Sequence, residues 1–232
     1  MSDSNKKSAI VTGGAVNLGK EICLSLARKG YDIALLYNSS DKGAEYAKKE
    51  IEALGVKCET FQHDLTDSSN LKPLIDEIFN KLPHTNLLIN NASIFDRVSM
   101  LETDEKLFDD NINIHLKAPF FLSKYFAVKA KKGQVINIID AKISQGYSPY
   151  FAYMLSKKAL SELTIMAAKE LAPNVRVNAL APDTMESSKG DSDGTPIKTE
   201  DVIKELFKII KNDNLVGEVI FISNNPLKEA II

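Results

Sequence analysis

Tyr153 and Lys157 stand four positions apart in a stretch of helical character. On a helix this spacing puts both side chains on one face, where they can reach the same small molecule. A phenol has a pKa of about 10 and transfers protons poorly at neutral pH, whereas a neighbouring ammonium favours its ionised form. We therefore expect Lys157 to bring the pKa of Tyr153 toward neutrality, and the pair to serve in general acid–base catalysis.

A glycine-lined turn spans residues 12–19, between an apolar run at residues 9–11 and a helical pattern that begins at once. Glycine lets the backbone come close to a phosphate, and the N–H groups and dipole at a helix start favour an anion there. Asn17 stands within the turn, and asparagine tolerates left-handed backbone better than most residues that have a side chain. The turn predicts a site for the pyrophosphate of a dinucleotide, although such turns also simply connect strands to helices.

Short apolar runs alternate with helical stretches, and these elements must position both sites. The runs lack clean polar–apolar alternation, as the strands of a parallel sheet do when helices cover both faces. Strands are expected at residues 9–11, 32–37, 57–62, 86–90, 134–139, 175–180 and 218–222, and helices at residues 42–54, 119–130, 151–171 and from Thr199. We predict one α/β domain over residues 1–232 with a doubly wound, Rossmann-like parallel sheet. Its cofactor half is expected at about residues 8–140 and its catalytic and substrate half at about residues 140–232.

The composition excludes several other classes of protein. The chain has 232 residues, of which 44% are hydrophobic, enough for one good core. Its 29 basic and 31 acidic side chains give a formal charge of −2, so we expect no surface for nucleic acid or an anionic membrane. Cys23 and Cys58 stand far apart, and His63 and His84 have no neighbouring ligand residues, so we expect buried reduced thiols and no metal site. The polar N-terminus and the shortness of the apolar runs predict a cytoplasmic protein.

The order and spacing of the motifs over residues 9–182 resemble the short-chain dehydrogenase/reductase family, and the general plan continues to about residue 222. Asn17 stands where the family's glycine motif usually has its middle glycine. Asn90-Asn91-Ala92-Ser93 closes the fourth expected strand with serine in place of the family's glycine, and residues 178–182 supply the family's Asn-x-x-x-Pro. The resemblance implies a nicotinamide cofactor bound by Gly13, Asn17, Leu18, Gly19, Asn38, Ser39, Ser40, Asp64, Leu65, Asn91, Ala92, Tyr153, Lys157 and Pro182.

The end of the second expected strand distinguishes the two nicotinamide cofactors. NAD-dependent enzymes keep an acidic residue there, which bonds the ribose and repels a 2′-phosphate. Asn38, Ser39 and Ser40 include no carboxylate and can donate hydrogen bonds to a phosphate, so NADPH is the expected cofactor. Asp41 is expected to begin the next helix. Asp64 resembles the family's aspartate that bonds the adenine ring, or it is only a turn residue.

Two departures from the usual family residues indicate a particular branch of the family. Asp140 stands where the family has its catalytic serine, and His115 where it has its catalytic asparagine. The whole set resembles the pteridine reductase and dihydromonapterin reductase branch, in which the aspartate and tyrosine pass a proton and a phenylalanine stacks on the pterin. This resemblance implies catalytic residues Asp140, Tyr153 and Lys157, and substrate-binding residues Ser93, Phe95, Asp140, Tyr150 and Tyr153. We expect burial and the nearby negative phosphates of the cofactor to raise the pKa of Asp140, so that it can stay protonated and donate to a ring nitrogen. Alternatively, Asp140 is a changed serine and Phe95 a core side chain.

Three functions remain open at this point. The leading one is the NADPH-dependent reduction of a dihydropteridine, dihydromonapterin or dihydrofolate-like substrate. The second keeps the cofactor and Tyr153 but reduces a ketone, such as a 3-oxoacyl or sugar carbonyl. The third is a catalytically silent dinucleotide-binding scaffold, against which the intact Tyr153 and Lys157 pair argues.

The resemblance also predicts a homotetramer. Helices 119–130 and 151–171 resemble those that pair between subunits in the family, and they carry more apolar residues than one buried face requires. The apolar tail at residues 230–232 is a further candidate for contact with a neighbouring subunit, whereas the polar loop at residues 186–194 carries no chemical signature.

Overall fold

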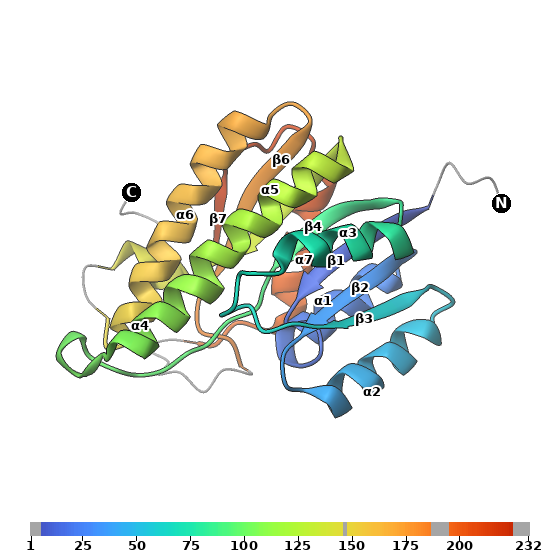
Figure 1. Cartoon of the computed structure of the whole chain (residues 1–232). Coiled ribbons are helices and arrows are strands. Elements are labelled where there is room, and N and C mark those ends of the chain that lie inside the picture. The colour runs from blue at the N-terminus through green and yellow to red at the C-terminus, as the bar shows by residue number, and fades with distance from the viewer. Residues whose placement is uncertain (1–5, 146–147, 187–194, 225–232) are drawn as a thin grey trace.

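The computed structural model describes residues 6–145, 148–186 and 195–224, which contain one seven-stranded parallel sheet (Figure 1). The strands are β1 (Lys7–Thr12), β2 (Tyr31–Tyr37), β3 (Cys58–Gln62), β4 (Thr85–Asn90), β5 (Gly133–Ile138), β6 (Val175–Pro182) and β7 (Val219–Ile222). Their spatial order is β3-β2-β1-β4-β5-β6-β7. The chain therefore moves outward from β1 to β3, returns to place β4 beside β1, and continues outward to β7. This is the predicted single-domain, Rossmann-like architecture, and ligands of such sheets bind at the carboxyl ends of the strands where the order reverses.

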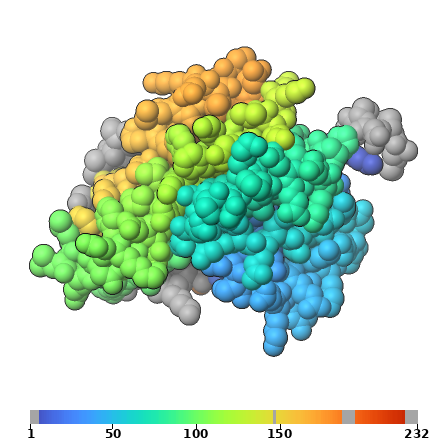
Figure 2. Space-filling model, viewed as in Figure 1, coloured from blue at the N-terminus to red at the C-terminus, as the bar shows by residue number. Residues whose placement is uncertain are grey.

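Helices cover both faces of the sheet (Figure 1). One face packs against α1 (Asn17–Ala27), α2 (Asp41–Glu52) and α7 (Thr199–Lys211), and the other against α3 (Leu71–Lys81), α5 (Ala118–Ala130) and α6 (Phe151–Leu171). The strand residues Ile10, Val11 and Leu88 are completely buried as a result, which explains why the apolar runs do not alternate. Figure 2 shows α3, α5 and α6 lying side by side as one continuous surface.

Helix α4 (Glu105–Ile112) and three short helical turns lie between the main elements. A single π-helical turn, η3 (Asn113–Lys117), connects α4 to α5, and two 3₁₀ turns, η2 (Met100–Glu102) and η4 (Ala141–Ser144), follow β4 and β5. Turns of π-helix occur mostly at functional sites. The chain thus changes its helical pitch at His115, which is one of the two substitutions noted in the sequence.

The predicted elements agree with the structure to within a few residues. Helix α6 has the predicted bounds. Helix α2 ends at Glu52 because the chain turns through Gly55, which has a φ of 84°. Asn17 has a φ of 49°, the left-handed conformation expected of it. Residues 187–194 of the polar loop and the tail at 230–232 lie outside the described residues.

A buried row of amide and hydroxyl groups ties the centre of the sheet to α6. Asn90 Nδ2 donates to Asn137 Oδ1 at 2.8 Å, and Asn137 Nδ2 donates to Thr164 Oγ1 at 2.9 Å. All three side chains are almost fully buried, so each hydrogen bond replaces one to water that folding removes. This row fixes α6, and with it Tyr153 and Lys157, against β4 and β5. No helix in the described ranges is long and apolar enough to cross a membrane.

Candidate active site

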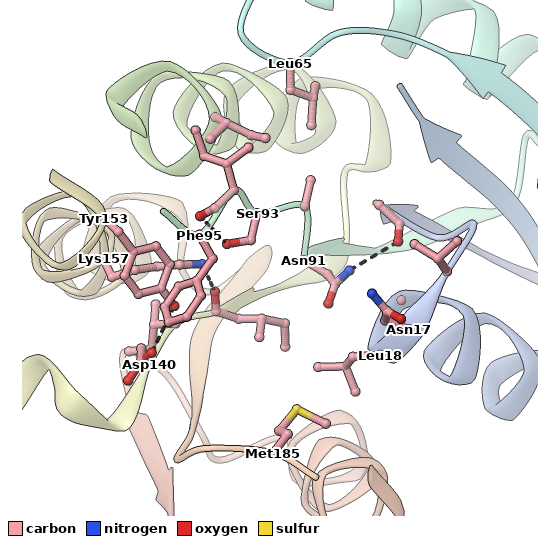
Figure 3. A pocket seen from close by; sticks show the side chains of 18 of the residues that line it. Asn17, Leu18, Leu65, Asn91, Ser93, Phe95, Asp140, Tyr153, Lys157 and Met185 are labelled. Atoms are coloured by element: carbon pink, nitrogen blue, oxygen red, sulfur yellow. Dashed lines mark hydrogen bonds between the residues drawn. The ribbon is translucent and has the colours of Figure 1, made fainter. Parts of the chain in front are cut away.

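A cavity of about 870 Å³ lies at the carboxyl ends of the strands, around the point where the strand order reverses. Every site residue expected from the sequence lines it. Figure 3 shows Asn17, Asn91, Asp140 and Tyr153 reaching the cavity from both halves of the chain. The cavity also has lining residues that were not expected, among them Lys142, Thr184 and Met185. Thr184 and Met185 directly follow Pro182, where the family resemblance weakens, so the sequence carried no clear signal for them.

The turn after β1 has the geometry of a phosphate cradle. Gly13 has a φ of 66°, and a Cβ on Gly19 would lie 2.0 Å from the carbonyl oxygen of Gly13. Only glycine therefore fits at position 19. Helix α1 starts here with Val16 as its N-cap, which provides no side-chain acceptor, and its first turn has no acidic residue. Its first N–H groups are left for an anion.

Asn91 joins the ends of the two central strands. Its backbone N–H donates to Thr12 Oγ1 at 2.8 Å and its Nδ2 donates to the Thr12 carbonyl oxygen at 2.9 Å. The next N–H, that of Ala92, also donates to Thr12 Oγ1, at 2.9 Å. Asn91 and Ala92 thus line the cavity and hold β4 against β1.

The end of β2 supplies the part of the wall where a 2′-phosphate would lie. Asn38, Ser39 and Ser40 line the cavity there, and the Asn38 carbonyl oxygen accepts a hydrogen bond of 2.9 Å from Gln62 Nε2. Asp41 begins α2, as expected. Asp64 lines the cavity as well, but its Oδ1 accepts from both the backbone N–H and the hydroxyl of Thr66, so the turn interaction that was its alternative role is present too.

Tyr153 and Asp140 form a hydrogen-bonded pair on the other side of the cavity (Figure 3). Tyr153 lies in the first turn of α6, and its hydroxyl donates to Asp140 Oδ2 at 2.9 Å. The second carboxyl oxygen, Oδ1, accepts from the Lys142 N–H at 2.8 Å. Lys157 Nζ donates to the Ile138 carbonyl oxygen at 2.8 Å. One side of the cavity therefore contains a phenol, a carboxyl group and an amine.

The protonation of these groups differs from the expectation for Tyr153. Burial, followed by the charge of Asp140 and its hydrogen bond, raises the pKa of Tyr153 well above its usual value. Lys157 does not offset this, because its Nζ lies 5.6 Å from the centre of the phenol ring and is bonded to the Ile138 carbonyl. The expectation that Lys157 brings the pKa of Tyr153 toward neutrality was wrong for this state of the site: the phenol holds its proton.

Burial also acts on the other two groups. It raises the pKa of Asp140, which the Lys142 N–H, the Tyr153 hydroxyl and the charge of Lys157 only partly offset. This is the direction expected from the sequence. Burial lowers the pKa of Lys157 to about 8, with the charge of Asp140 acting in the opposite sense. The site therefore combines a phenol that keeps its proton, a carboxyl group whose pKa is raised and an amine whose pKa lies near the physiological range.

Phe95 forms an aromatic wall next to this pair. Its ring stacks on Tyr150, with centres 4.2 Å apart and planes at 16°, and meets the Tyr153 ring edge-on at 4.7 Å. Its exposure of 42% excludes the alternative that Phe95 is a core side chain. A flat ring that enters the cavity can stack on this wall within reach of the Tyr153 hydroxyl.

Cys23 and Cys58 are buried free thiols. Within the described ranges, no group of three or more His, Cys, Asp or Glu side chains is placed to hold a metal ion.

Comparison with known proteins agrees with this geometry. The sequence profile of the family described as short chain dehydrogenase matches residues 7–195. The chain belongs to the short-chain dehydrogenase family. It is therefore an NAD(P)-dependent oxidoreductase with a nicotinamide dinucleotide as its cofactor.

Three relatives illustrate the range of this short-chain dehydrogenase's similarity. The 3-oxoacyl-(acyl-carrier-protein) reductase FabG of Staphylococcus aureus is 29% identical over 96% of this chain and 92% of its own length. The L-2,3-butanediol dehydrogenase of Corynebacterium glutamicum is 37% identical over 76% of this chain and 70% of its own length. Among solved structures, FolM alternative dihydrofolate reductase 1 from Brucella canis, complexed with NADP, has a TM-score of 0.86 at 27% identity and covers 96% of this chain and 97% of its own.

Proposed function

We propose that this short-chain dehydrogenase is an NADPH-dependent reductase of a pterin-like heterocycle. The observation that carries the proposal is the hydrogen bond between Tyr153 and Asp140 next to the exposed ring of Phe95. It combines a proton donor with an aromatic wall, which is what a flat nitrogen-containing ring requires. The similarity to a dihydrofolate reductase solved with NADP supports both the substrate class and the cofactor.

The residues of the cofactor end fit a nicotinamide dinucleotide. The cradle between Gly13 and Gly19 has no room for a Cβ, and the start of α1 offers its N–H groups to the pyrophosphate. Asn38, Ser39 and Ser40 would hold the 2′-phosphate. When bound, the nicotinamide supplies a hydride.

The chain's own contribution to the reaction is the proton. Reduction of a carbon–nitrogen double bond adds a hydride at carbon and a proton at nitrogen, and the Tyr153 hydroxyl is the group placed to donate that proton. The Tyr153 hydroxyl donates to Asp140 Oδ2 at 2.9 Å, and burial raises the pKa of this carboxyl. Once Tyr153 has given up its proton, the protonated form of Asp140 would be the neighbouring group able to replace it. Lys157 is ionised below a pH of about 8, and its positive charge compensates the negative charge that Tyr153 develops as it gives up its proton.

A ketone reductase is the second candidate, and two of the relatives favour it. One is named for a 3-oxoacyl substrate and the other for butanediol. The same Tyr153 hydroxyl would then donate to a carbonyl oxygen. A small ketone gains little from stacking on Phe95 and has no second nitrogen for Asp140, so these two residues distinguish the candidates.

A panel of substrates followed by loss of NADPH absorbance tests the proposal. We expect kcat/KM for dihydrobiopterin or dihydromonapterin to exceed that for an acetoacetyl ester. Phe95→Ala should lower the pterin value by roughly tenfold, the size of one lost aromatic contact, and leave the ester value nearly unchanged. Asp140→Ser should likewise lower kcat/KM for the pterin and leave kcat/KM for the ester nearly unchanged.

The controls separate the three possible functions. Phe108→Ala removes a ring that is 40% exposed but lies on α4 outside the cavity. This variant should leave kcat/KM unchanged for both the pterin and the ester. A wild-type enzyme that reduces the ester and ignores both pterins would leave only the ketone reductase. NADPH binding without turnover of any substrate would point to the silent scaffold.

A further inference from the structure

Three side chains that are distant in sequence form a row of hydrogen bonds behind the side of the cavity that contains Tyr153. Ser93 Oγ lies 2.9 Å from His115 Nε2, and the Ile94 backbone N–H donates to the same nitrogen at 3.2 Å. On the opposite side of the ring, His115 Nδ1 lies 2.9 Å from Ser156 Oγ. His115 and Ser156 are almost completely buried, in η3 and α6 respectively. The row therefore joins the loop after β4 to the helix that carries Tyr153.

The backbone fixes the direction of these hydrogen bonds. An amide N–H can only donate, so His115 Nε2 must be the nitrogen without a proton, and Nδ1 must carry one. Nδ1 then donates to Ser156 Oγ, whose hydroxyl donates to the Tyr153 carbonyl oxygen at 2.7 Å. Burial, followed by the charge of Lys157, lowers the pKa of His115 well below its usual value, so the ring is neutral. His115 and Ser156 therefore each have a defined role, whereas the Ser93 hydroxyl lies within hydrogen-bonding distance of both His115 Nε2, at 2.9 Å, and the Ile94 carbonyl oxygen, at 3.2 Å.

A serine beside a histidine also occurs in acyl-transfer enzymes, where the histidine is the general base that activates the serine. The geometry here argues against such a role for His115. The unprotonated nitrogen is already shared with the Ile94 N–H, and burial opposes the imidazolium that a general base must become. The other nitrogen faces the Ser156 hydroxyl rather than a carboxylate that would stabilise the cation. His115 is therefore suited to hold neighbouring groups in place and not to accept a proton.

The row connects the two parts of the site that a substrate must touch together. Ser93 is two residues before Phe95, and both line the cavity. The His115 ring meets the Tyr153 ring edge-on, with centres 5.3 Å apart and planes at 87°. A displacement of His115 would thus move the Phe95 wall and the Tyr153 hydroxyl relative to one another.

We propose that Ser93, His115 and Ser156 act as one positioning unit that sets the distance between the Phe95 wall and the catalytic helix. Ser93 and His115 stand where the short-chain dehydrogenase family usually has a glycine and an asparagine. Because their side chains lie within hydrogen-bonding distance of each other, we treat the two substitutions as one paired change. Neither His115 nor Ser156 lines the cavity, so these two act through the residues that they hold. The unit goes beyond the proposed function and rests on it only for the kinetic readout below.

Nitrogen-15 NMR of the histidine rings tests the unit without any substrate. We expect His115 to show a protonated Nδ1 and an unprotonated Nε2, unchanged between about pH 6 and pH 9. His115→Asn identifies its signals among those of the three histidines. A proton on Nε2, or titration of the ring within this range, would overturn the proposal.

A double-mutant cycle tests the pairing. Ser93→Gly and His115→Asn should each lower kcat by roughly tenfold through misplacement of the reacting groups, with the Kd for NADPH changed less than about twofold. The double variant should recover most of the loss, since it restores the family's pair. Ser156→Ala should lower kcat as well, and should add little further loss to His115→Asn.

The controls distinguish positioning from mere stability and from failure of the proposed function. His84→Asn changes an exposed histidine outside the cavity and should leave kcat unchanged. Additive losses in the double variant, or single variants with lowered Tm but wild-type kcat, would overturn the proposal. If wild-type enzyme reduces no substrate, the proposed function fails, while the NMR spectra and the same cycle measured in Tm still decide whether the unit exists.

Discussion

Asp140 is the residue at which burial and charge oppose each other most directly. Its carboxyl lies against Tyr153 in a buried site, so its pKa is raised from the ordinary value of 3.8. Between the ordinary pKa and the raised one, the unfolded chain has lost this proton while the folded chain still holds it. The folded state therefore loses stability as pH rises through this window, and the penalty is complete above the raised pKa.

A neutral replacement should remove that penalty. We expect Asp140→Asn to increase the free energy of unfolding by about 1 kcal/mol at pH 8, a usual size for relieving a strained functional site, and by less at about pH 3, below the ordinary pKa of the carboxyl. Urea denaturation at both pH values measures the difference. Asp96→Asn, an exposed carboxyl on the loop after β4, is the matched control and should have no such effect. An equal gain for Asp140→Asn at both pH values would show that folding does not raise the pKa of this carboxyl.

The Tyr153 hydroxyl should be required for turnover and not for cofactor binding. Tyr153→Phe keeps the ring against Phe95 and His115 but removes the proton and the bond to Asp140. We expect turnover to fall at least about a hundredfold, the contribution of one positioned acid, while fluorescence titration gives a nearly unchanged NADPH affinity. Near-normal turnover in this variant would refute Tyr153 as the acid.

At the scale of elements, local patterns predicted the scaffold well. Helix α6 and the central strands β1, β4 and β5 appeared in the predicted order because their apolar periodicity is set by which faces are buried. Asn17, Asn91 and Asp140 could be named in advance as cavity residues because they follow the carboxyl ends of those strands, whereas Thr184 and Met185, which follow β6, could not. Local sequence suffices when the relevant distance runs along one element or between the ends of neighbouring strands.

The chemistry of the site depended on contacts that no local pattern encodes. The stack of Phe95 on Tyr150 and the row through His115 each join residues that are far apart along the chain. The raised pKa of Tyr153 depends on how deeply α6 is buried, and the Tyr153–Lys157 spacing alone suggested the opposite shift. Spacing on one helix predicts which side chains are neighbours, whereas burial determines which protonation state they favour.

The end of β2 offers a test of cofactor choice at this scale. Asn38 is held there by Gln62 on the neighbouring strand β3, so a replacement at position 38 keeps its place in the wall. We expect Asn38→Asp to weaken NADPH binding more than NADH binding, by roughly tenfold in the ratio of the two Kd values, through repulsion of the 2′-phosphate. Fluorescence titration with both cofactors measures this ratio.

The control for Asn38→Asp is the same substitution at a position far from the cofactor cavity. Asn80→Asp adds the same negative charge on an exposed position of α3, outside the cavity, and should leave the ratio unchanged. An unchanged ratio for Asn38→Asp as well would mean that the 2′-phosphate lies somewhere other than the end of β2.

At the scale of the whole molecule, one face exposes more apolar surface than a monomer needs. Helices α5 and α6 lie beside each other on it (Figure 2), and Phe120, Val128 and Met166 are exposed by 47%, 72% and 68%. Both helices already bury other apolar residues against the sheet. Phe120, Val128 and Met166 are therefore not needed to fill the core of the single chain. Surplus apolar surface on a pair of helices indicates an interface between subunits.

We therefore predict a homotetramer in which α5 and α6 pack against their counterparts. Burying this face would remove apolar side chains from water and join subunits in pairs. The family resemblance implies that two such pairs associate, so light scattering at micromolar concentration should give the mass of four chains. Met166→Glu places a charge in the interface, where desolvation opposes it, and should give smaller species. Tyr46→Glu replaces a side chain that is 65% exposed on α2, against the opposite face of the sheet, and should leave the assembly intact. A wild-type monomer would contradict the prediction, and an intact tetramer of Met166→Glu would place the interface on another surface.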